Sequence, residues 1–183
     1  MAYYQNLPAL QRIQGEFKEL MRNPMTTFGI TVGLFNEDNP FVWKCTILGP
    51  KDTCYRGGLF YLKIIFPPDY PIKKPEIIFI TPIYHLNVKY FVSGTQPLGH
   101  ICISTLNKWK PEYKMNKVLP EIFYLFSNNN PGDPYDDRAY SRRNEFLSNR
   151  ALFEEKARFF TNKYANPLKK RTEYTTDWDF SYP

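Results

Sequence analysis

The chain has 183 residues, a length that suits one domain with a substantial core, and 43% of its residues are hydrophobic, including 15 Phe, 14 Tyr and 3 Trp. No window of about 18 apolar residues occurs, so no membrane-spanning helix is expected. Three Cys, an odd number, disfavour a disulfide framework, and the first residues, MAYYQNLPAL, lack the basic and apolar regions of a secretory signal. We therefore expect a protein of a reducing compartment, the cytoplasm and/or the nucleus.

The net charge of +6 is unevenly distributed along the chain. Residues 138–171 carry ten Lys or Arg against three Glu, whereas residues 172–183 carry three acids and no base. A basic stretch of this kind can attract nucleic acid or acidic lipid. A solvated helix face with interspersed charges is the interpretation we prefer, so neither a nucleic-acid partner nor a membrane is expected.

The spacing of apolar residues predicts the elements in chain order. Leu10, Ile13, Phe17, Leu20 and Met21 recur at helical spacing and predict a first helix, which Asn23-Pro24 ends. Apolar alternation or short apolar runs predict strands at residues 28–35, 41–47, 59–66 and 76–80. These four strands are expected to form an antiparallel meander, with residues 28–35 the weakest candidate.

The second half of the chain begins with a segment of no sustained period, residues 81–114, which we interpret as irregular. It holds both His residues and one Cys, and long irregular segments inside compact domains are usually functional or disordered. Helical spacing then returns from Val118 to Phe126, and two more helices are predicted at residues 136–147 and 150–165. The pattern predicts an α+β fold, with a core domain over residues 1–165 and a tail over residues 166–183.

The three cysteines differ in context. Cys45 lies on the apolar face of a predicted strand and is expected to be a buried small hydrophobe, whereas Cys54 lies in a loop. Cys102 lies in GHICIST, within the irregular segment. Together with His85 and His100 it lacks the paired spacing of zinc modules, and neither His has the context of a known cysteine protease, so no metal or cofactor is expected.

Four blocks of the sequence carry a family resemblance. LGPKDTCYRGGLFYLKIIFPP, FPPDYPIKKPEIIFITPIYHLNV, GHICISTLNKWKP and NNNPGDPY stand in the order and spacing of the ubiquitin-conjugating enzymes, which the chain resembles from about residue 8 to residue 165. The resemblance implies the UBC fold. It also implies that ubiquitin, or a ubiquitin-like protein, is accepted from an activating enzyme as a thioester and passed to a lysine amine with a RING-type ligase.

The resemblance assigns roles to four residues. Cys102 takes the position of the nucleophile, whose thioester is formable from an activated donor and labile to amines. Asn87 takes the position of the Asn of the His-Pro-Asn motif, where its amide would stabilise an oxyanion or brace the neighbouring loop. His85, at the motif's His, would hold the local turn and not act as general base. Asp133 would position the incoming lysine. Asn87 and Asp133 are also residue types that simply form turns.

The chain departs from the family pattern near these residues. Leu86 replaces the motif's Pro, so the turn after His85 loses a fixed φ. The connection between Asn87 and Cys102, residues 88–101, is longer than in most members, and we expect a loop there whose aromatic residues are partly tucked against the domain. Ser104 stands where many members carry an acid, and the loop before Asp133 is rich in Asn.

The resemblance also implies where partners dock. The activating enzyme and a RING-type ligase are expected on the first helix and two loops, at Gln11, Arg12, Gly15, Pro71, Ile72, Trp109, Lys110 and Pro111. A monomer is expected. The alternative is a catalytically weak or inactive variant that binds ubiquitin or scaffolds a partner, against which the presence of Cys102 argues. The residues do not distinguish ubiquitin from SUMO or another relative.

Overall fold

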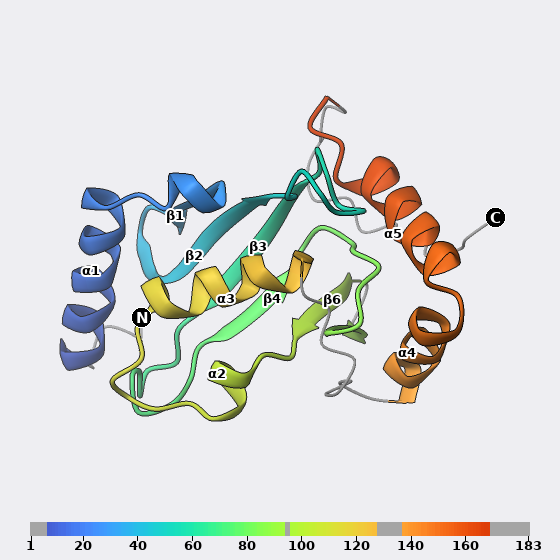
Figure 1. Ribbon diagram of the computed structural model, residues 1–183. Helices are drawn as coiled ribbons and strands as arrows, with labels where there is room; N and C mark the ends of the chain where they lie inside the picture. The colour runs from blue at the N-terminus through green and yellow to red at the C-terminus, as the bar shows by residue number, and fades with distance from the viewer. Residues whose placement is uncertain (1–6, 94–95, 128–136, 169–183) are drawn as a thin grey trace.

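The computed structural model describes residues 7–93, 96–127 and 137–168 (Figure 1). The elements in chain order are α1 (Leu7–Arg22), the 3-10 helix η2 (Thr26–Phe28), β1 (Ile30–Asn36), β2 (Asn39–Leu48), β3 (Leu59–Ile65), β4 (Glu76–Phe79), β5 (Val88–Ser93), β6 (Gln96–Ile101), α2 (Ser104–Asn107), α3 (Met115–Ser127), α4 (Asp137–Ser148) and α5 (Arg150–Tyr164). The α+β expectation is confirmed. The predicted helices and the first four strands are present within a few residues of their expected ends.

The strands form one antiparallel sheet in the order β1-β2-β3-β4-β6-β5. Its first four strands are the expected meander. The fifth and sixth were not predicted, because residues 81–114 were interpreted as irregular throughout. Residues 88–101 instead form a hairpin, and Ile78 and Phe79 of β4 pair with His100 and Gly99 of β6. The segment forms strands because it pairs with a strand distant in sequence, and the local spacing of residues does not reveal such a pairing.

The core lies between the meander and α3, which crosses one face of the sheet (Figure 1). The alternating residues of β2 and β3 that the sequence assigns to one face are fully or almost fully buried, among them Phe41, Trp43, Cys45, Ile47, Phe60, Leu62 and Ile64. From α3, Phe126 packs its ring against those of Phe60 at 5.0 Å and Phe79 at 6.1 Å. The sheet and α3 thus flank residues 81–114, the segment that holds Cys102.

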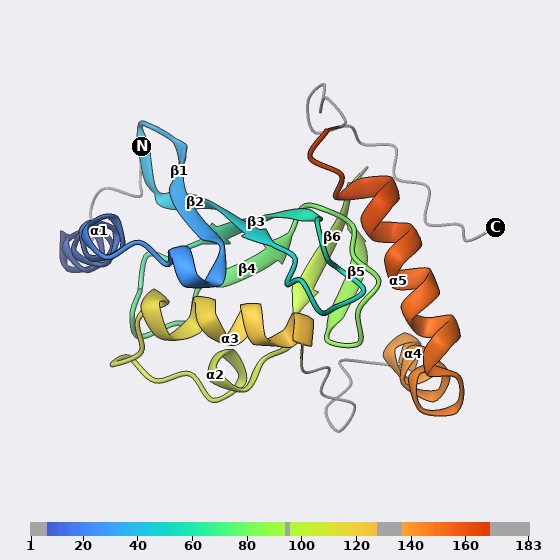
Figure 2. The same cartoon turned by 45° about the horizontal axis from the view of Figure 1, so that its top comes forward.

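Helix α1 and the pair α4–α5 stand at opposite ends of the sheet (Figures 1 and 2). The apolar stripe of α5 packs through Phe153 and Phe160 on the ring of Tyr84, at 5.3 and 5.6 Å between ring centroids. The carbonyl of Ala165 accepts a hydrogen bond of 2.7 Å from Leu59 N–H, which joins the end of α5 to β3. Most of the expected tail, residues 169–183, lies outside the described residues, so the domain boundary at residue 165 stays a prediction.

Candidate active site

Cys102 directly follows β6 and is 7% exposed. Its backbone N–H donates to the carbonyl of Asn87 at 2.9 Å, and its Sγ accepts a hydrogen bond from Asn107 Nδ2 at 3.2 Å. The predicted nucleophile therefore lies beside an amide donor and is joined to the predicted oxyanion residue through the backbone.

The other two thiols have different surroundings. Cys45 is fully buried, as expected, and burial raises the pKa of its thiol to about 12. Its Sγ donates to the carbonyl of Thr46 at 3.8 Å, so it is held as a thiol. Cys54 is half-buried, and desolvation raises its pKa to about 11. Both thiols are poor nucleophiles at neutral pH, because the thiolate is the reactive form.

The turn before β5 is organised by His85, which is 1% exposed. Its Nδ1 accepts from the N–H of Asn87 at 2.9 Å, so the other ring nitrogen carries the proton and donates to the carbonyl of Leu125 at 2.9 Å. Desolvation, with a smaller contribution from the nearby charge of Arg142, lowers the pKa of His85 to about 4. His85 is therefore neutral near pH 7 with both nitrogens occupied, which suits holding a turn and not taking a proton.

Leu86, the residue in place of the motif's proline, is fully buried. A proline would fix φ at this position, whereas here the hydrogen bonds of His85 and the burial of Leu86 hold the turn. Asn87 is also buried, at 1% exposure, so its surroundings constrain it closely. Of the other residues singled out nearby, Ser104 is exposed at the start of α2, and Asp133 lies outside the described residues.

Three residues that the sequence pattern did not single out also make hydrogen bonds around Cys102 and the His85 turn. Arg142 of α4 donates to the carbonyls of His85 at 2.9 Å and Val88 at 2.8 Å, which ties the turn and the edge of β5 to a distant helix. Tyr55 is fully buried and its hydroxyl donates to the carbonyl of Tyr84 at 2.8 Å. The third is Asn107. A polar residue in an expected helix or loop gives no local signal of such long-range contacts.

The residues expected to dock partners come together from three segments. Arg12 of α1 donates through Nη2 to the carbonyl of Pro111 at 3.3 Å, and Trp109 donates through Nε1 to the carbonyl of Pro71 at 2.8 Å. Ile72 is 76% exposed beside them. Gln11, Gly15 and Lys110 are exposed, and a methyl group built on Gly15 would meet no atom within 4 Å. We call this set, with Arg12, Pro71, Ile72, Trp109 and Pro111, the docking face.

A buried carboxylate, which the sequence did not single out, holds the docking face together. Glu16 is 4% exposed and accepts hydrogen bonds from Tyr70 Oη at 2.7 Å and from the backbone N–H of Met115 at 2.8 Å. It also accepts from Arg12 Nε at 2.5 Å. One side chain of α1 thus fixes both loops and the start of α3.

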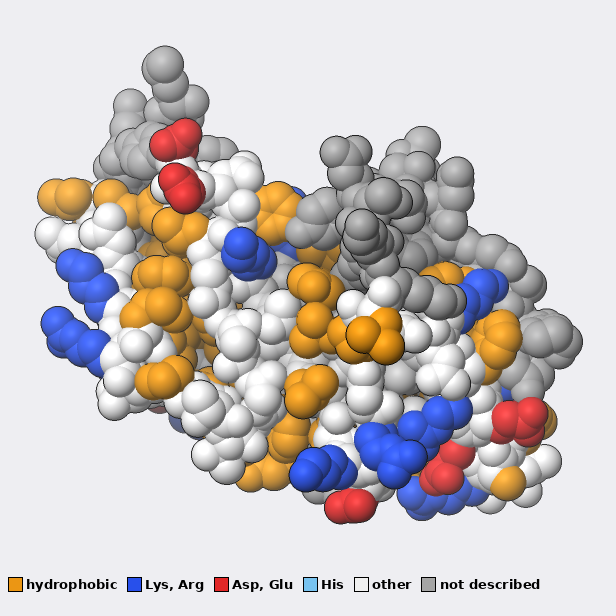
Figure 3. All heavy atoms as spheres, turned by 90° about the horizontal axis from the view of Figure 1, so that it is seen from above, with side chains coloured by type: hydrophobic (Ala, Val, Ile, Leu, Met, Phe, Trp, Pro, Cys, Tyr) orange, Lys and Arg blue, Asp and Glu red, His pale blue; other side chains and the backbone are white. Residues whose placement is uncertain are grey.

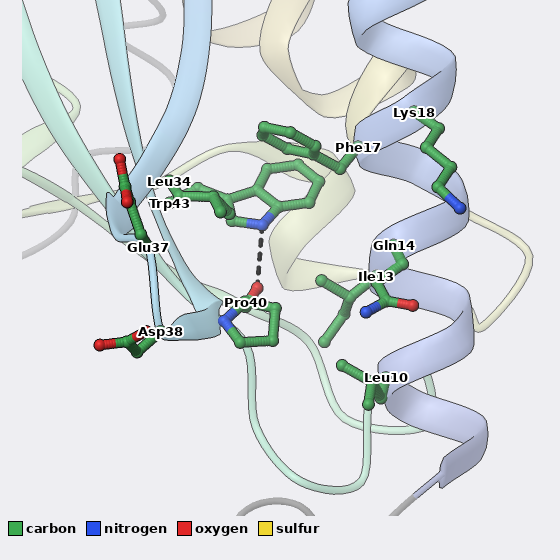
Figure 4. A pocket seen from close by; sticks show the side chains of 10 residues that line it. All are labelled: Leu10, Ile13, Gln14, Phe17, Lys18, Leu34, Glu37, Asp38, Pro40 and Trp43. Atoms are coloured by element: carbon green, nitrogen blue, oxygen red, sulfur yellow. Dashed lines mark hydrogen bonds between the residues drawn. The ribbon is translucent and has the colours of Figure 1, made fainter.

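The opposite flank of α1 borders a groove of about 400 Å³ against β1 and β2 (Figure 4). Its walls are Leu10, Ile13, Phe17 and Trp43, and Trp43 donates to the carbonyl of Pro40 at 3.0 Å. Lys18, Glu37 and Asp38 stand at its rim, and no thiol or His lines it. The groove is an apolar surface feature without the chemistry of an active site.

The basic stretch on α4 and α5 is interspersed with acids, and Figure 3 shows Lys and Arg side chains beside Asp and Glu at one edge of that view. Arg150 pairs with Glu154 at 2.7 Å, Lys156 pairs with Glu145, and Arg158 donates to the carbonyl of Thr53 at 3.0 Å. These cations serve contacts within the protein, which favours the solvated helix face over a nucleic-acid surface.

Two further properties concern the described residues alone. No group of three His, Cys, Asp or Glu among them is arranged to hold a metal ion. Along residues 7–93, 96–127 and 137–168, no helix combines the length and apolar character needed to cross a membrane.

A comparison with protein families agrees with this geometry. The family model described as ubiquitin-conjugating enzyme matches residues 12–161, well over half of the chain. The match begins at Arg12 within α1, ends at Thr161 within α5, and includes Cys102, the His85–Asn87 turn and both loops of the docking face.

Proposed function

The chain belongs to the ubiquitin-conjugating enzyme family, and we propose that it accepts ubiquitin or a ubiquitin-like protein as a thioester on Cys102 and transfers it to a lysine amine. The observation that carries this proposal is the position of Cys102 within the matched region, bonded to Asn87 and to Asn107. Cys45 and Cys54 offer no comparable arrangement, since burial raises the pKa of both thiols.

The proposed charging step is an exchange of one thioester for another. The thiolate of Cys102 attacks the carbonyl carbon that links the modifier to the sulfur of the activating enzyme. A bond forms between that carbon and Sγ, the old carbon–sulfur bond breaks, and the activating enzyme leaves as a thiolate. No change in oxidation state and no cofactor is needed.

In the transfer step, the lysine amine attacks the same carbonyl carbon. The new carbon–nitrogen bond forms, the bond to Sγ breaks, Cys102 leaves as a thiolate and the amine loses a proton. Asn87 is proposed to stabilise the oxyanion by donating from its amide, and Asp133 to position the lysine. Because both nitrogens of His85 are occupied within the protein, His85 is not proposed as the base.

The docking face is the proposed contact for the activating enzyme and a RING-type ligase. Its exposed Ile72 and preordered prolines suit a modest, transient interface. We also propose that the protein is a monomer and that it is located in the cytoplasm and/or the nucleus. The alternative, an inactive member that only binds ubiquitin or scaffolds a partner, has no observation in its favour beyond Leu86 and the long hairpin.

The test is a charging assay with purified protein, ATP, candidate activating enzymes and each candidate modifier, read on gels with and without thiol. Wild type is expected to gain a thiol-sensitive adduct that Cys102→Ala lacks, while Cys45→Ala and Cys54→Ala still charge. Cys102→Ser should give a thiol-resistant ester. An adduct on Cys54 would overturn the assignment, and no adduct with any modifier would favour the inactive alternative.

A further inference from the structure

Asn107, to which the family resemblance assigned no role, touches the sulfur of Cys102. Its Nδ2 lies 3.2 Å from Sγ, a short distance for a hydrogen bond to sulfur. A thiolate accepts such a bond much more strongly than a neutral thiol does, because the charge resides on the sulfur. An amide N–H at this position therefore favours the charged form of the nucleophile.

The fold fixes the backbone at Asn107, a residue that is itself exposed. It closes the short helix α2, where its backbone N–H donates to Ile103 at 3.0 Å. Leu106, 4% exposed, anchors the helix in the core, and Thr105 N–H lies 3.4 Å from a carboxylate oxygen of Glu121 on α3. An amide carried on a backbone held in this way needs less reorganisation than one on a free loop as charge develops on the sulfur.

We propose that Asn107 is a catalytic residue whose side-chain amide stabilises the thiolate of Cys102. This inference rests on the proposed function and deepens it. Sulfur carries the negative charge before it attacks the modifier's thioester and again when the amine displaces it, so one donor serves both steps. The carbon–sulfur bond is made in the first step and broken in the second, as described above.

The expected size of the effect follows from two opposing trends. Loss of a hydrogen bond to a charged group corresponds to a shift of about one pH unit in the ionisation of the sulfur. At any pH below the ionisation midpoint of the thiol, the thiolate fraction then falls about tenfold. The intrinsic nucleophilicity of the thiolate rises about threefold, so charging should be about threefold slower. Transfer should slow as well, since a more basic thiolate is a poorer leaving group.

The first experiment measures the sulfur without any modifier. The rate of alkylation of Cys102 by iodoacetamide is followed against pH in a Cys54→Ser background, with the modified residue identified by peptide mass spectrometry. Asn107→Ala is expected to move the midpoint up by about one pH unit. Asn107→Asp, nearly isosteric and therefore least disturbing to the fold, should move it further by placing a carboxylate beside the thiolate. Asn162→Ala, an exposed Asn on α5, is the matched control and should leave it unchanged.

A midpoint that stays in place in Asn107→Ala would overturn the proposal whatever Asn107→Asp does, because the added carboxylate shifts the midpoint by its own charge. A midpoint that falls in Asn107→Ala would also overturn it, because the amide oxygen would then be accepting from the neutral thiol. Single-turnover charging of Asn107→Ala provides the second readout. Alkylation needs neither modifier nor activating enzyme, so the midpoints can be interpreted even if the proposed function fails. If the protein charges but the midpoints do not move, only the role of Asn107 is refuted.

Discussion

The backbone N–H of Cys102 donates to the carbonyl of Asn87 at 2.9 Å, although residues 88–101 separate the two in sequence. The intervening hairpin begins and ends at this bond, since Val88 pairs with Ile101. The spacing between the proposed nucleophile and the proposed oxyanion residue is thus set at the base of the hairpin and does not depend on its length.

Substitution of Asn87 separates charging from transfer. Asn87→Ala is expected to charge on Cys102 but to transfer to free lysine more slowly, by about 10²–10³-fold if one oxyanion donor is lost. Single-turnover discharge measures the rate, and a urea melt measures folding, because Asn87 is buried. Transfer at the wild-type rate would show that Asn87 is only a turn residue, and a collapse of stability would show that it braces the loop.

Shortening of the hairpin tests its role in the choice of acceptor. Replacing residues 93–98 by a tight turn removes the outer pairs of β5 and β6 but keeps Val88↔Ile101 and Lys89↔His100. Folding and charging should stay close to wild type, since a change in loop length costs little. Ligase-stimulated transfer, or the preference among acceptors, should change. If the shortened protein matches wild type with every acceptor and cognate ligase, the hairpin has no role in the choice of acceptor or ligase.

The buried His85 predicts a pH dependence of stability. Its pKa is about 4 in the folded protein against 6.5 for the ordinary side chain, so the unfolded chain binds a proton that the folded chain excludes. The contribution of His85 to the free energy of unfolding should therefore be fully present above pH 6.5. It should fall by about 3 kcal/mol as the pH drops through 4. Urea unfolding of wild type and His85→Gln across this range measures the difference. Equal pH slopes in the two proteins would contradict the prediction.

Glu16 should be far more important for folding than its neighbour Glu19 on the same helix. Glu16→Gln puts an amide where three donors converge and is expected to lower the free energy of unfolding by about 2–4 kcal/mol. Glu19→Gln, whose carboxylate is 38% exposed and pairs with Lys114, should cost less than about 1 kcal/mol. Urea melts of both variants make the comparison, and an equal loss of unfolding free energy in the two would refute this role of Glu16.

Gly15 should accept a side chain in the free protein. A methyl group there meets no atom within 4 Å, so Gly15→Ala should raise the free energy of unfolding by about 1 kcal/mol through helix propensity. Gly49→Ala is the opposite case, because its methyl group would lie 1.9 Å from the carbonyl oxygen of Tyr55 and must destabilise the protein. Thermal melts test both. A fall in ligase-stimulated transfer by the stable Gly15→Ala would support a ligase contact at Gly15.

Local spacing was enough to predict α1, α3, α4, α5 and the first four strands, but not η2 or α2. The repeats at Leu10, Ile13 and Phe17 in α1 and the alternation from Phe41 to Ile47 in β2 are properties of short segments, and burial of one face follows directly from them. The blocks around His85 and Cys102 likewise identified the family before any fold was known. These patterns can be recognised in the sequence because each depends on only a few neighbouring residues.

Tertiary structure decided how those segments meet. Residues 88–101 became strands because β4 offers a free edge to His100 and Gly99, a partner that lies far from them in sequence. Asn107 reaches Sγ because α2 is anchored on α3, and Arg142 reaches the carbonyl of His85 from a helix beyond Asp133. A hydrogen bond depends on an approach of about 3 Å between two atoms. For groups this far apart in sequence, the folded chain and not the local pattern determines that approach.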